Sequence, residues 1–243
     1  MNKEYELKLS LTPEVAQKLT KKKALSGVSK KRRQQRRLVS TYFDTPRHIL
    51  RKSGMALRIR NDGRQRTQTL KIGTTGPAGL QNHDEWSAVI DGDRPNFDRI
   101  DDEELARSLA RRRCEDRLNS VFTTDIERTS MLLKTPGAKV ELAIDQGHIR
   151  AGKNGRHREE PVCEAELELV SGDPASMLEL ALNLCETYGI QLAHRTKAER
   201  GYALARPSLR PRPAKARLRA LDPGMTAGEA FDAVIRSALH HLF

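Results

Sequence analysis

The first predicted strand carries charged residues in a pattern that suits binding of a cation and an anion together. In Glu4-Tyr5-Glu6-Leu7-Lys8 the side chains alternate between two faces, so both carboxylates and the ammonium group share one face. The apolar residues lie on the other face and can be buried. Two interpretations are open: a solvated edge strand, or a site where paired carboxylates hold a divalent cation and the lysine contacts an anion.

The same separation of charged and apolar faces recurs later in the chain. Residues 164–168 place three glutamates on one face, and residues 56–60 place two arginines on one face. Glu141 and Asp145 share a face of another predicted strand. Single charges lie in three further predicted strands: Lys71, Glu85 and Arg128. Like charges two positions apart repel, so each row needs a counter-charge.

Rows of opposite sign would neutralise each other if the strands closed into a barrel with these faces inward. Burying so many charges without a ligand would cost free energy, whereas a water-filled tunnel holding a metal and a polyanion removes that cost. Carboxylates bind Mg²⁺ or Mn²⁺, and arginine and lysine bind phosphoryl oxygens. The rows therefore predict a site for phosphoryl transfer.

Other catalytic classes lack their signatures. No glycine-rich loop ends in Lys-Ser or Lys-Thr, no histidine pair has the spacing of a helical zinc motif, and no serine or cysteine nucleophile motif is present. Three cysteines without metal-ligand spacing favour a reducing compartment. No apolar run is long enough for a membrane span or a signal peptide. The sequence predicts a cytoplasmic protein without a membrane partner.

The net charge of +12 is concentrated in three stretches. Residues 30–37, 111–113 and 206–219 together carry 15 basic side chains and no acidic one, so the remainder is slightly acidic. None of these stretches interleaves basic residues with aromatic ones. This distribution allows nonspecific attraction to polyanions, and it argues against sequence-specific nucleic-acid binding.

About eight strands and two or three helices position these charges. Asp62-Gly63 predicts a hairpin turn, and short turns separate most neighbouring strands, so we expect an α+β fold built on an antiparallel sheet or barrel. The predicted strands after the first cover 38–44, 55–61, 67–72, 83–90, 121–134, 139–149 and 161–170. Helices are predicted over 13–24, 98–113 and 174–188, and a short helix or turn over 197–204. Loops are predicted over 30–37, 73–79 and 150–160.

The final part of the chain differs in composition. Residues 205–222 are rich in proline and basic residues, which is typical of a linker. Residues 226–243 predict an amphipathic helix, and a lone helix cannot bury its apolar stripe by itself. We expect it either to dock on the preceding domain or to belong to a second one.

Taken in order, these segments resemble the CYTH superfamily, the triphosphate tunnel metalloenzymes. The resemblance covers residues 1–204. It rests on these segments: Glu4-x-Glu6-x-Lys8, Tyr42-Phe43-Asp44-Thr45, Ala56-Leu57-Arg58-Ile59-Arg60, Thr69-Leu70-Lys71, Glu85-Trp86, Glu141 to Asp145, Glu164-x-Glu166-x-Glu168 and Lys197-Ala198-Glu199-Arg200. It implies an eight-stranded antiparallel barrel, open at both ends as a tunnel, with helices packed outside. Residues 223–243 resemble the first helix of a truncated CHAD domain.

The resemblance also implies roles for individual residues. The metal ligands for Mg²⁺ or Mn²⁺ would be Glu4, Glu6, Asp145, Glu164, Glu166 and Glu168. The phosphate-binding residues would be Lys8, Arg58, Arg60, Lys71, Arg128, Lys197 and Arg200. Lys71 with Tyr42 would activate or place the attacking water, since a tyrosine hydroxyl beside a lysine can relay a proton.

Several functions remain open at this level. The resemblance favours hydrolysis of inorganic tripolyphosphate, or a short polyphosphate, to pyrophosphate and phosphate. A nucleoside or thiamine triphosphatase, a class IV adenylate cyclase and a non-catalytic polyphosphate-binding module are the alternatives. The acidic rows argue against the last, because a pure polyanion binder gains nothing from carboxylates in its cavity. Whether the basic stretches and the CHAD-like helix bind longer polyphosphate, and whether the chain forms a homodimer, stays open.

Overall fold

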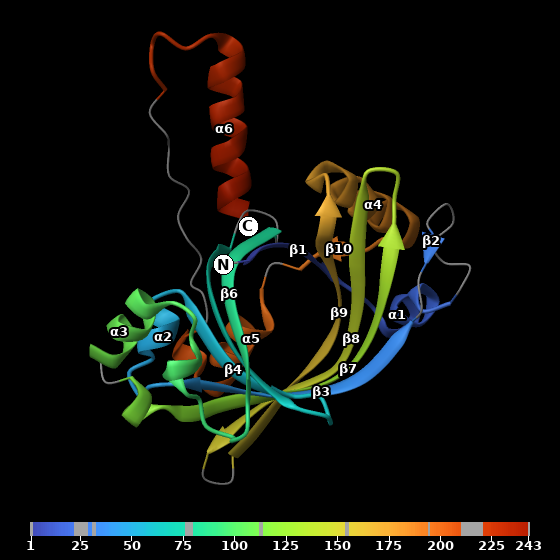
Figure 1. Cartoon of the computed structure of the whole chain (residues 1–243). Helices are drawn as coiled ribbons and strands as arrows, with labels where there is room; N and C mark the ends of the chain where they lie inside the picture. Colours follow the sequence, from blue (N-terminus) through green and yellow to red (C-terminus); the bar gives the residue numbers. More distant parts are fainter. Residues whose placement is uncertain are drawn as a thin grey trace.

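The computed structural model shows one large, curved antiparallel sheet with helices against its outer surface (Figure 1). The structure describes residues 2–21, 29–30, 33–75, 80–111, 114–153, 156–193, 195–209 and 221–242. Among the helices of these ranges, none combines the length and the apolar character that crossing a membrane requires.

Strands make up most of the described chain. They are β1 (Asn2–Ser10), β2 (Ser29–Lys30), β3 (Gln34–Asp44), β4 (Met55–Asn61), β5 (Arg66–Thr75), β6 (Leu80–Ile90), β7 (Asn119–Lys134), β8 (Ala138–Lys153), β9 (Arg156–Gly172) and β10 (Gln191–Leu192). The α-helices are α1 (Pro13–Leu19), α2 (Ile49–Lys52), α3 (Glu103–Arg111), α4 (Pro174–Tyr188), α5 (Lys197–Ala205) and α6 (Ala227–Leu242). Short 3₁₀ helices are η2 (Phe97–Arg99), η3 (Glu115–Arg117) and η4 (Pro207–Leu209).

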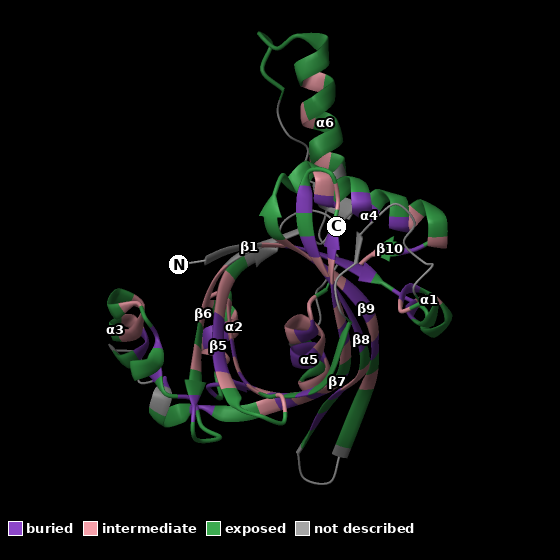
Figure 2. Ribbon diagram, turned by 45° about the vertical axis from the view of Figure 1, so that its right-hand side comes forward, coloured by how far each residue is buried: buried purple, intermediate pink, exposed green. Residues whose placement is uncertain are grey.

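Strand β1 is paired along both of its edges. Leu7 lies opposite Leu80 of β6 on one side and opposite Leu167 of β9 on the other. The described pairings therefore lead from β1 through β6, β5, β4, β3, β7, β8 and β9 back to β1. The antiparallel sheet with helices is confirmed, but α5 lies on the inner side of the sheet (Figure 2), where no helix was expected. The two-residue strands β2 and β10 add to the eight strands expected. A tunnel open at both ends stays a prediction.

Local sequence signals explain the main turns and caps. Gly63 has φ 85° in the β4–β5 hairpin, a conformation that suits glycine. Asp173 accepts a hydrogen bond from Ala175 N at the start of α4, and Gly189 ends that helix with φ 64°. Thr196 and Glu199 form a capping box at the start of α5.

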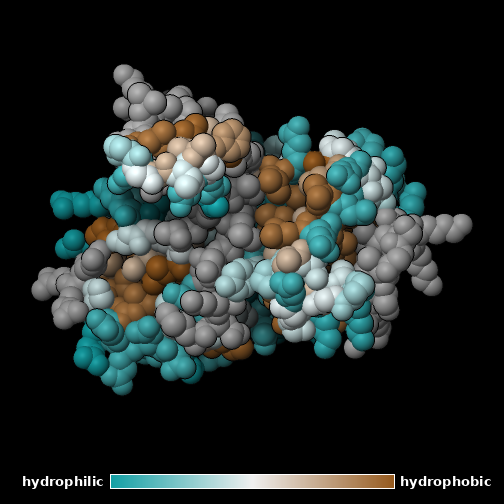
Figure 3. Space-filling view, turned by 90° about the horizontal axis from the view of Figure 1, so that it is seen from above, coloured by the Kyte–Doolittle hydropathy of each residue, from teal (hydrophilic) through white to brown (hydrophobic). Residues whose placement is uncertain are grey.

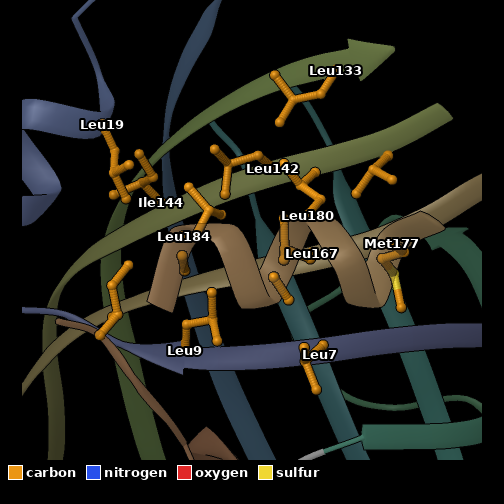
Figure 4. Packing of buried hydrophobic residues seen from close by; sticks show 14 of the residues in the cluster. Leu7, Leu9, Leu19, Leu133, Leu142, Ile144, Leu167, Met177, Leu180 and Leu184 are labelled. Atoms are coloured by element: carbon orange, nitrogen blue, oxygen red, sulfur yellow. The ribbon is translucent and has the colours of Figure 1, made fainter. Parts of the chain in front are cut away.

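The apolar face of the sheet is covered by helices, and the charged face is turned inward. Figure 4 shows leucines of β1, β8 and β9 packing against α4, and α1 contributes Leu19 to the same cluster. A second cluster packs α2, η2 and α3 against β4 and β5 around Leu57 and Leu70. Because alternate residues point in opposite directions, this packing leaves the charged rows to face the interior of the sheet.

Several predicted boundaries were wrong. The helix expected over 98–113 divides into η2 and α3, because Asn96 caps the first and the Asp102 side chain accepts a hydrogen bond from Leu105 N at the start of the second. The loop expected over 150–160 is mostly strand, stabilised by an ion pair between Arg150 and Glu159. Part of the loop expected over 30–37 belongs to β3, and β5 extends to Thr75.

Helix 13–24 also ends earlier than predicted, at Leu19, while residues 22–28 lie outside the described residues. Residues 31–32, 76–79, 112–113 and 210–220 also lie outside the described residues. All of these ranges except 76–79 belong mainly to the three basic stretches.

The amphipathic helix predicted near the end of the sequence is present as α6 and lies apart from the sheet (Figure 1). Phe231, Val234 and Ile235 of this helix are exposed, as are Leu178 and Leu182 of α4. In Figure 3 the hydrophobic residues of the upper face form separate patches among hydrophilic ones. The assignment of α6 to a CHAD domain, and the division at residues 204 and 222, stay predictions.

Candidate active site

The inner face of the sheet surrounds a cavity of about 1140 Å³. Charged residues from the predicted rows line it, together with α5, which contacts β7, β8 and β9 (Figure 2). The sequence-predicted residues on its surface are Glu6, Lys8, Tyr42, Arg58, Arg60, Lys71, Arg128, Glu166, Glu168 and Lys197. Segments far apart in sequence thus contribute to one charged chamber.

Three carboxylates lie together on β8 and β9, and we call them the carboxylate wall: Asp145, Glu164 and Glu166. The strand register sets Asp145 opposite Glu164, and alternation places Glu166 on the same face. Asp145 and Glu164 are almost completely buried. One oxygen of each residue lies within 4.8 Å of the others, a spacing that could hold a metal ion.

Lys197 of α5 is inserted among these three carboxylates. Its Nζ lies 2.6 Å from Asp145 Oδ2, 2.5 Å from Glu164 Oε1 and 2.9 Å from Glu166 Oε1. Burial lowers the pKa of Lys197, but the three acids outweigh burial and raise the pKa above its ordinary value. The side chain is therefore a charged ammonium.

Two further cations reach Glu166. Arg128 binds Asp145 through two hydrogen bonds of 2.7 and 2.6 Å and also contacts Glu166. Lys8 contacts Glu6 and lies 3.1 Å from Glu166. Burial raises the pKa of Glu166, yet Lys197, Lys8 and Arg128 hold it well below its ordinary value. Glu166 is therefore ionised and shared among three cations.

Arg58 and Arg60 of β4 form a second surface, which we call the arginine wall. Arg58 Nη1 donates to the Tyr42 hydroxyl at 3.5 Å, and its buried Nε has no hydrogen-bond partner among the described residues. Arg60 Nε donates to Ser40 Oγ at 3.4 Å. Burial and the charges of Arg58 and Arg128 lower the pKa of Arg60 to about 9. Among the described residues neither arginine forms a salt bridge, and Glu85 and Glu166 act on them only from a distance, so the wall favours an anion.

Tyr42 and Lys71 both line the cavity, and their contacts differ. The Tyr42 ring stacks on Phe122 with centroids 4.4 Å apart. Burial raises the pKa of the Tyr42 hydroxyl, but Arg58, Arg60 and Lys197 together bring it below its ordinary value. Lys71 Nζ lies 2.9 Å from Glu85 and 3.9 Å from Glu6. A joint role of Tyr42 and Lys71 in placing water stays a prediction.

The remaining predicted residues lie at the edge of this arrangement. Glu168 of β9 lines the cavity opposite Glu6 in the strand register. Arg200 is bound to Glu160 at 2.7 Å and to Glu164 at 3.1 Å, and it does not line the cavity formed by the described residues. Glu4 lies on β1, but its side chain is outside the described part of the chain.

Comparison with known proteins identifies the family, since the CYTH domain matches residues 2–202. The chain belongs to the CYTH family. The inorganic triphosphatase of Haemophilus influenzae is 32% identical to this CYTH chain over 209 residues, which cover 84% of the chain and 55% of the relative. The chain thus spans about half the length of that curated relative.

Solved structures agree with this CYTH assignment at the level of the fold. A candidate adenylate cyclase from Bacillus halodurans has a TM-score of 0.53 at 21% identity, covering 82% of this chain and 98% of its own. A candidate adenylyl cyclase from Hippeastrum, described as having a dominant triphosphatase activity, has a TM-score of 0.54 at 18% identity, with coverages of 84% and 96%. At these identities the likeness concerns the fold alone.

The donor atoms of the CYTH carboxylate wall suit a hard divalent cation. All three residues offer carboxylate oxygens, which are the ligands that Mg²⁺ and Mn²⁺ prefer. Glu6 and Glu168 lie on the neighbouring part of the same cavity and enlarge the oxygen-rich surface. The residues present therefore fit a metal ion, and the group found among the described residues contains only oxygen ligands.

Sequence reasoning missed the residues that hold α5 in the CYTH fold. Tyr202 donates a hydrogen bond of 2.8 Å to the buried carboxylate of Asp44, which also accepts backbone hydrogen bonds from Leu50 and Arg51 of α2. Gly201 lies directly against the Phe122 ring, where a Cβ atom would overlap it. An aspartate before Thr-Pro and a short helix was the available signal, because aspartate often caps helices.

Proposed function

We propose that this chain hydrolyses inorganic tripolyphosphate, or a short polyphosphate, to pyrophosphate and phosphate with Mg²⁺ or Mn²⁺. One observation carries the proposal: the cavity is lined by an arginine wall that forms no salt bridge among the described residues, and by Glu166, one of three carboxylates with a metal-ligand spacing. A triphosphate–metal complex has both of the charges that these walls would balance. The name of the Haemophilus influenzae relative, an inorganic triphosphatase, supports the same substrate class.

The basic residues of the cavity would bind the phosphates. Arg58 and Arg60 hold phosphoryl oxygens from one side, because guanidinium groups bind them with paired hydrogen bonds. The other cations of the cavity complete this set: Lys8, Lys71, Arg128 and Lys197. Arg200 was predicted to bind phosphate as well. Its hydrogen bonds to Glu160, Glu164 and Pro161 of β9 favour instead a role in holding α5 against that strand.

The carboxylate wall would hold the divalent cation, with Glu6, Glu168 and Glu4 as further candidate ligands. When bound, the metal neutralises charge on the phosphoryl oxygens and lowers the pKa of a bound water. A domain over residues 1–204 contains all of these side chains. Binding of longer polyphosphate by the basic stretches and homodimer formation stay predictions.

In the proposed reaction, a water oxygen forms a bond to the terminal phosphorus. The bond from this phosphorus to the bridging oxygen breaks, and pyrophosphate leaves with the electron pair. The proton of the water passes through the Tyr42 hydroxyl, whose pKa the surrounding cations lower, to an oxygen of the departing pyrophosphate. Lys71 stabilises the charge that develops on the phosphoryl oxygens and the leaving group, while the arginine wall holds the substrate in place.

Phosphate release from tripolyphosphate, ATP and thiamine triphosphate tests this function. With Mg²⁺ or Mn²⁺, wild-type protein is expected to hydrolyse tripolyphosphate fastest, and Glu4→Ala is expected to lose most of the activity. Preference for ATP or thiamine triphosphate would favour an organic triphosphatase, and formation of cyclic AMP would favour a cyclase. Salt-sensitive binding of tripolyphosphate without turnover would replace the proposal with a binding module.

A further inference from the structure

Lys197 occupies the part of the cavity where the carboxylate wall would otherwise coordinate a metal. Its Nζ is within 2.9 Å of an oxygen from each of Asp145, Glu164 and Glu166. Among the described cations, Arg128 contacts two of these residues, Lys8 one and Arg200 one. Only Lys197 of these four contacts all three.

A divalent cation and this ammonium group cannot share the same oxygens. Mg²⁺ binds carboxylate oxygens at about 2.1 Å, so an ion between the three side chains would lie almost where Nζ now lies. The metal ion and the ammonium group would then lie almost in contact, and two positive charges so close together repel strongly in a buried site. Occupation by the metal therefore requires Lys197 to leave.

Resting on the metal part of the proposed function, we propose that Lys197 is a tethered counter-ion that competes with the divalent cation for the carboxylate wall. When the cation binds, the ammonium is displaced into the cavity, where the triphosphate oxygens receive it. Binding of metal and substrate would thus exchange one set of ion pairs for another, and the buried carboxylates would never lack a positive partner.

The anchoring of α5 confines this exchange to a side chain. Tyr202 is fixed to Asp44 by a buried hydrogen bond, and Gly201 packs against Phe122, so the helix backbone is held one turn beyond Lys197. The four rotatable bonds of a lysine allow its ammonium to move while the backbone stays in place. Arg128, held by a two-pronged contact with Asp145, lacks this freedom.

Binding of Mn²⁺ alone, measured by electron paramagnetic resonance without any phosphate, tests the competition. Lys197→Met keeps the unbranched side chain up to the position of Cε and removes the competing ammonium, so Mn²⁺ is expected to bind at least about tenfold more tightly. Arg200→Met is the matched control, since it removes a cation of the same helix that contacts only Glu164 of the wall. The Mn²⁺ affinity of Arg200→Met is expected to differ from that of wild type by less than about threefold.

If both variants bind Mn²⁺ more tightly to the same extent, the cause is a general charge effect and the competition is overturned. Unchanged or weaker Mn²⁺ binding by Lys197→Met would also overturn the competition. Absence of Mn²⁺ binding in wild type and both variants would overturn the metal site itself, and with it the proposed function. Circular dichroism of each variant verifies its fold.

A second measurement uses the wild-type protein and does not depend on a variant. The side-chain ammonium signal of Lys197 in a ¹⁵N-lysine spectrum is expected to shift when Mg²⁺ is added, because its three carboxylate partners are lost. A signal that stays unchanged at Mg²⁺ saturation would contradict the competition.

Discussion

The two walls of the cavity balance their charges in opposite ways. On the carboxylate wall, each buried acid is bound by at least one cation, and Glu166 contacts three. On the arginine wall, Arg58 and Arg60 contact only hydroxyl groups of Tyr42 and Ser40 in the hydrogen bonds found among the described residues. The first wall already contains Lys197, the cation that a metal would replace, whereas the second can bind an anion that the described residues do not supply.

This difference separates what each wall is expected to do. Loss of a residue from the carboxylate wall should affect the metal and the rate, because the metal stabilises the reacting phosphoryl group. Loss of a residue from the arginine wall should affect mainly substrate affinity. Substitutions in each wall can therefore separate a loss of rate from a loss of affinity.

Replacing Glu166 is expected to have the largest effect. Glu166→Gln removes a metal ligand and leaves Lys8, Arg128 and Lys197 with one carboxylate fewer. The rate of phosphate release should fall by about a hundredfold or more, as for loss of a group that stabilises the transition state. Glu159→Gln on the same strand, an exposed position, should remain close to wild type. A rate within about threefold of wild type for Glu166→Gln would contradict the role of Glu166 as a metal ligand.

Replacing Arg58 should act mainly on substrate binding. Arg58→Met removes a charged hydrogen-bond donor from the arginine wall, so KM for tripolyphosphate should rise by about ten- to a hundredfold, with a smaller change in kcat. Steady-state kinetics measure both constants. Arg37→Met removes an exposed arginine that pairs with Asp125, and it should leave KM unchanged. An unchanged KM in Arg58→Met would remove the distinction between the walls.

The contact between α5 and β7 sets the position of Lys197 and offers a stability test. A methyl group at Gly201 overlaps the Phe122 ring, so Gly201→Ala should lower the free energy of unfolding by about 1 to 3 kcal/mol. Gly228→Ala in α6 is the control, because nothing lies within 4 Å of the added atom. Urea denaturation should show that control to be unchanged or slightly stabilised. Equal stability of the two variants would mean that α5 does not pack closely on β7.

Acid titration of Glu85 is expected to give the smallest effect. Although burial raises the pKa of Glu85, Lys71 and Ser87 lower it from 4.5 to about 2. A carboxyl with a lowered pKa in the folded state contributes stability above pH 4.5 that is lost as the pH falls towards 2. The difference in melting temperature between wild type and Glu85→Gln should therefore shrink over that interval. If the difference in melting temperature grows on acidification, ionised Glu85 does not stabilise the fold and the prediction is wrong.

Strand alternation indicated several of the residues that line the cavity. Lys8, Arg58 and Glu166 lie on it because every second residue of a strand points inward while the apolar ones meet the outer helices. The turn at Asp62-Gly63 and the caps of α4 and α5 were also predictable, since they depend on residues close in sequence.

Contacts between distant segments were not predictable from the sequence. The position of Lys197 among Asp145, Glu164 and Glu166 depends on the register of β8 and β9 and on where α5 packs. The contact of Gly201 with Phe122 carries no local signal, because a glycine within a helix commonly indicates only weaker helix propensity. Strand ends such as 150–160 were missed because cross-strand ion pairs extend the ladder beyond the propensity pattern.

The most direct test of the account is the rate of phosphate release from tripolyphosphate by the wild-type protein as Mn²⁺ or Mg²⁺ is titrated. If the two walls serve one metal-dependent reaction, the rate is at background in chelator and rises to saturation as the cation is added. Release that persists in chelator, or no release at any concentration of either cation, would contradict the account.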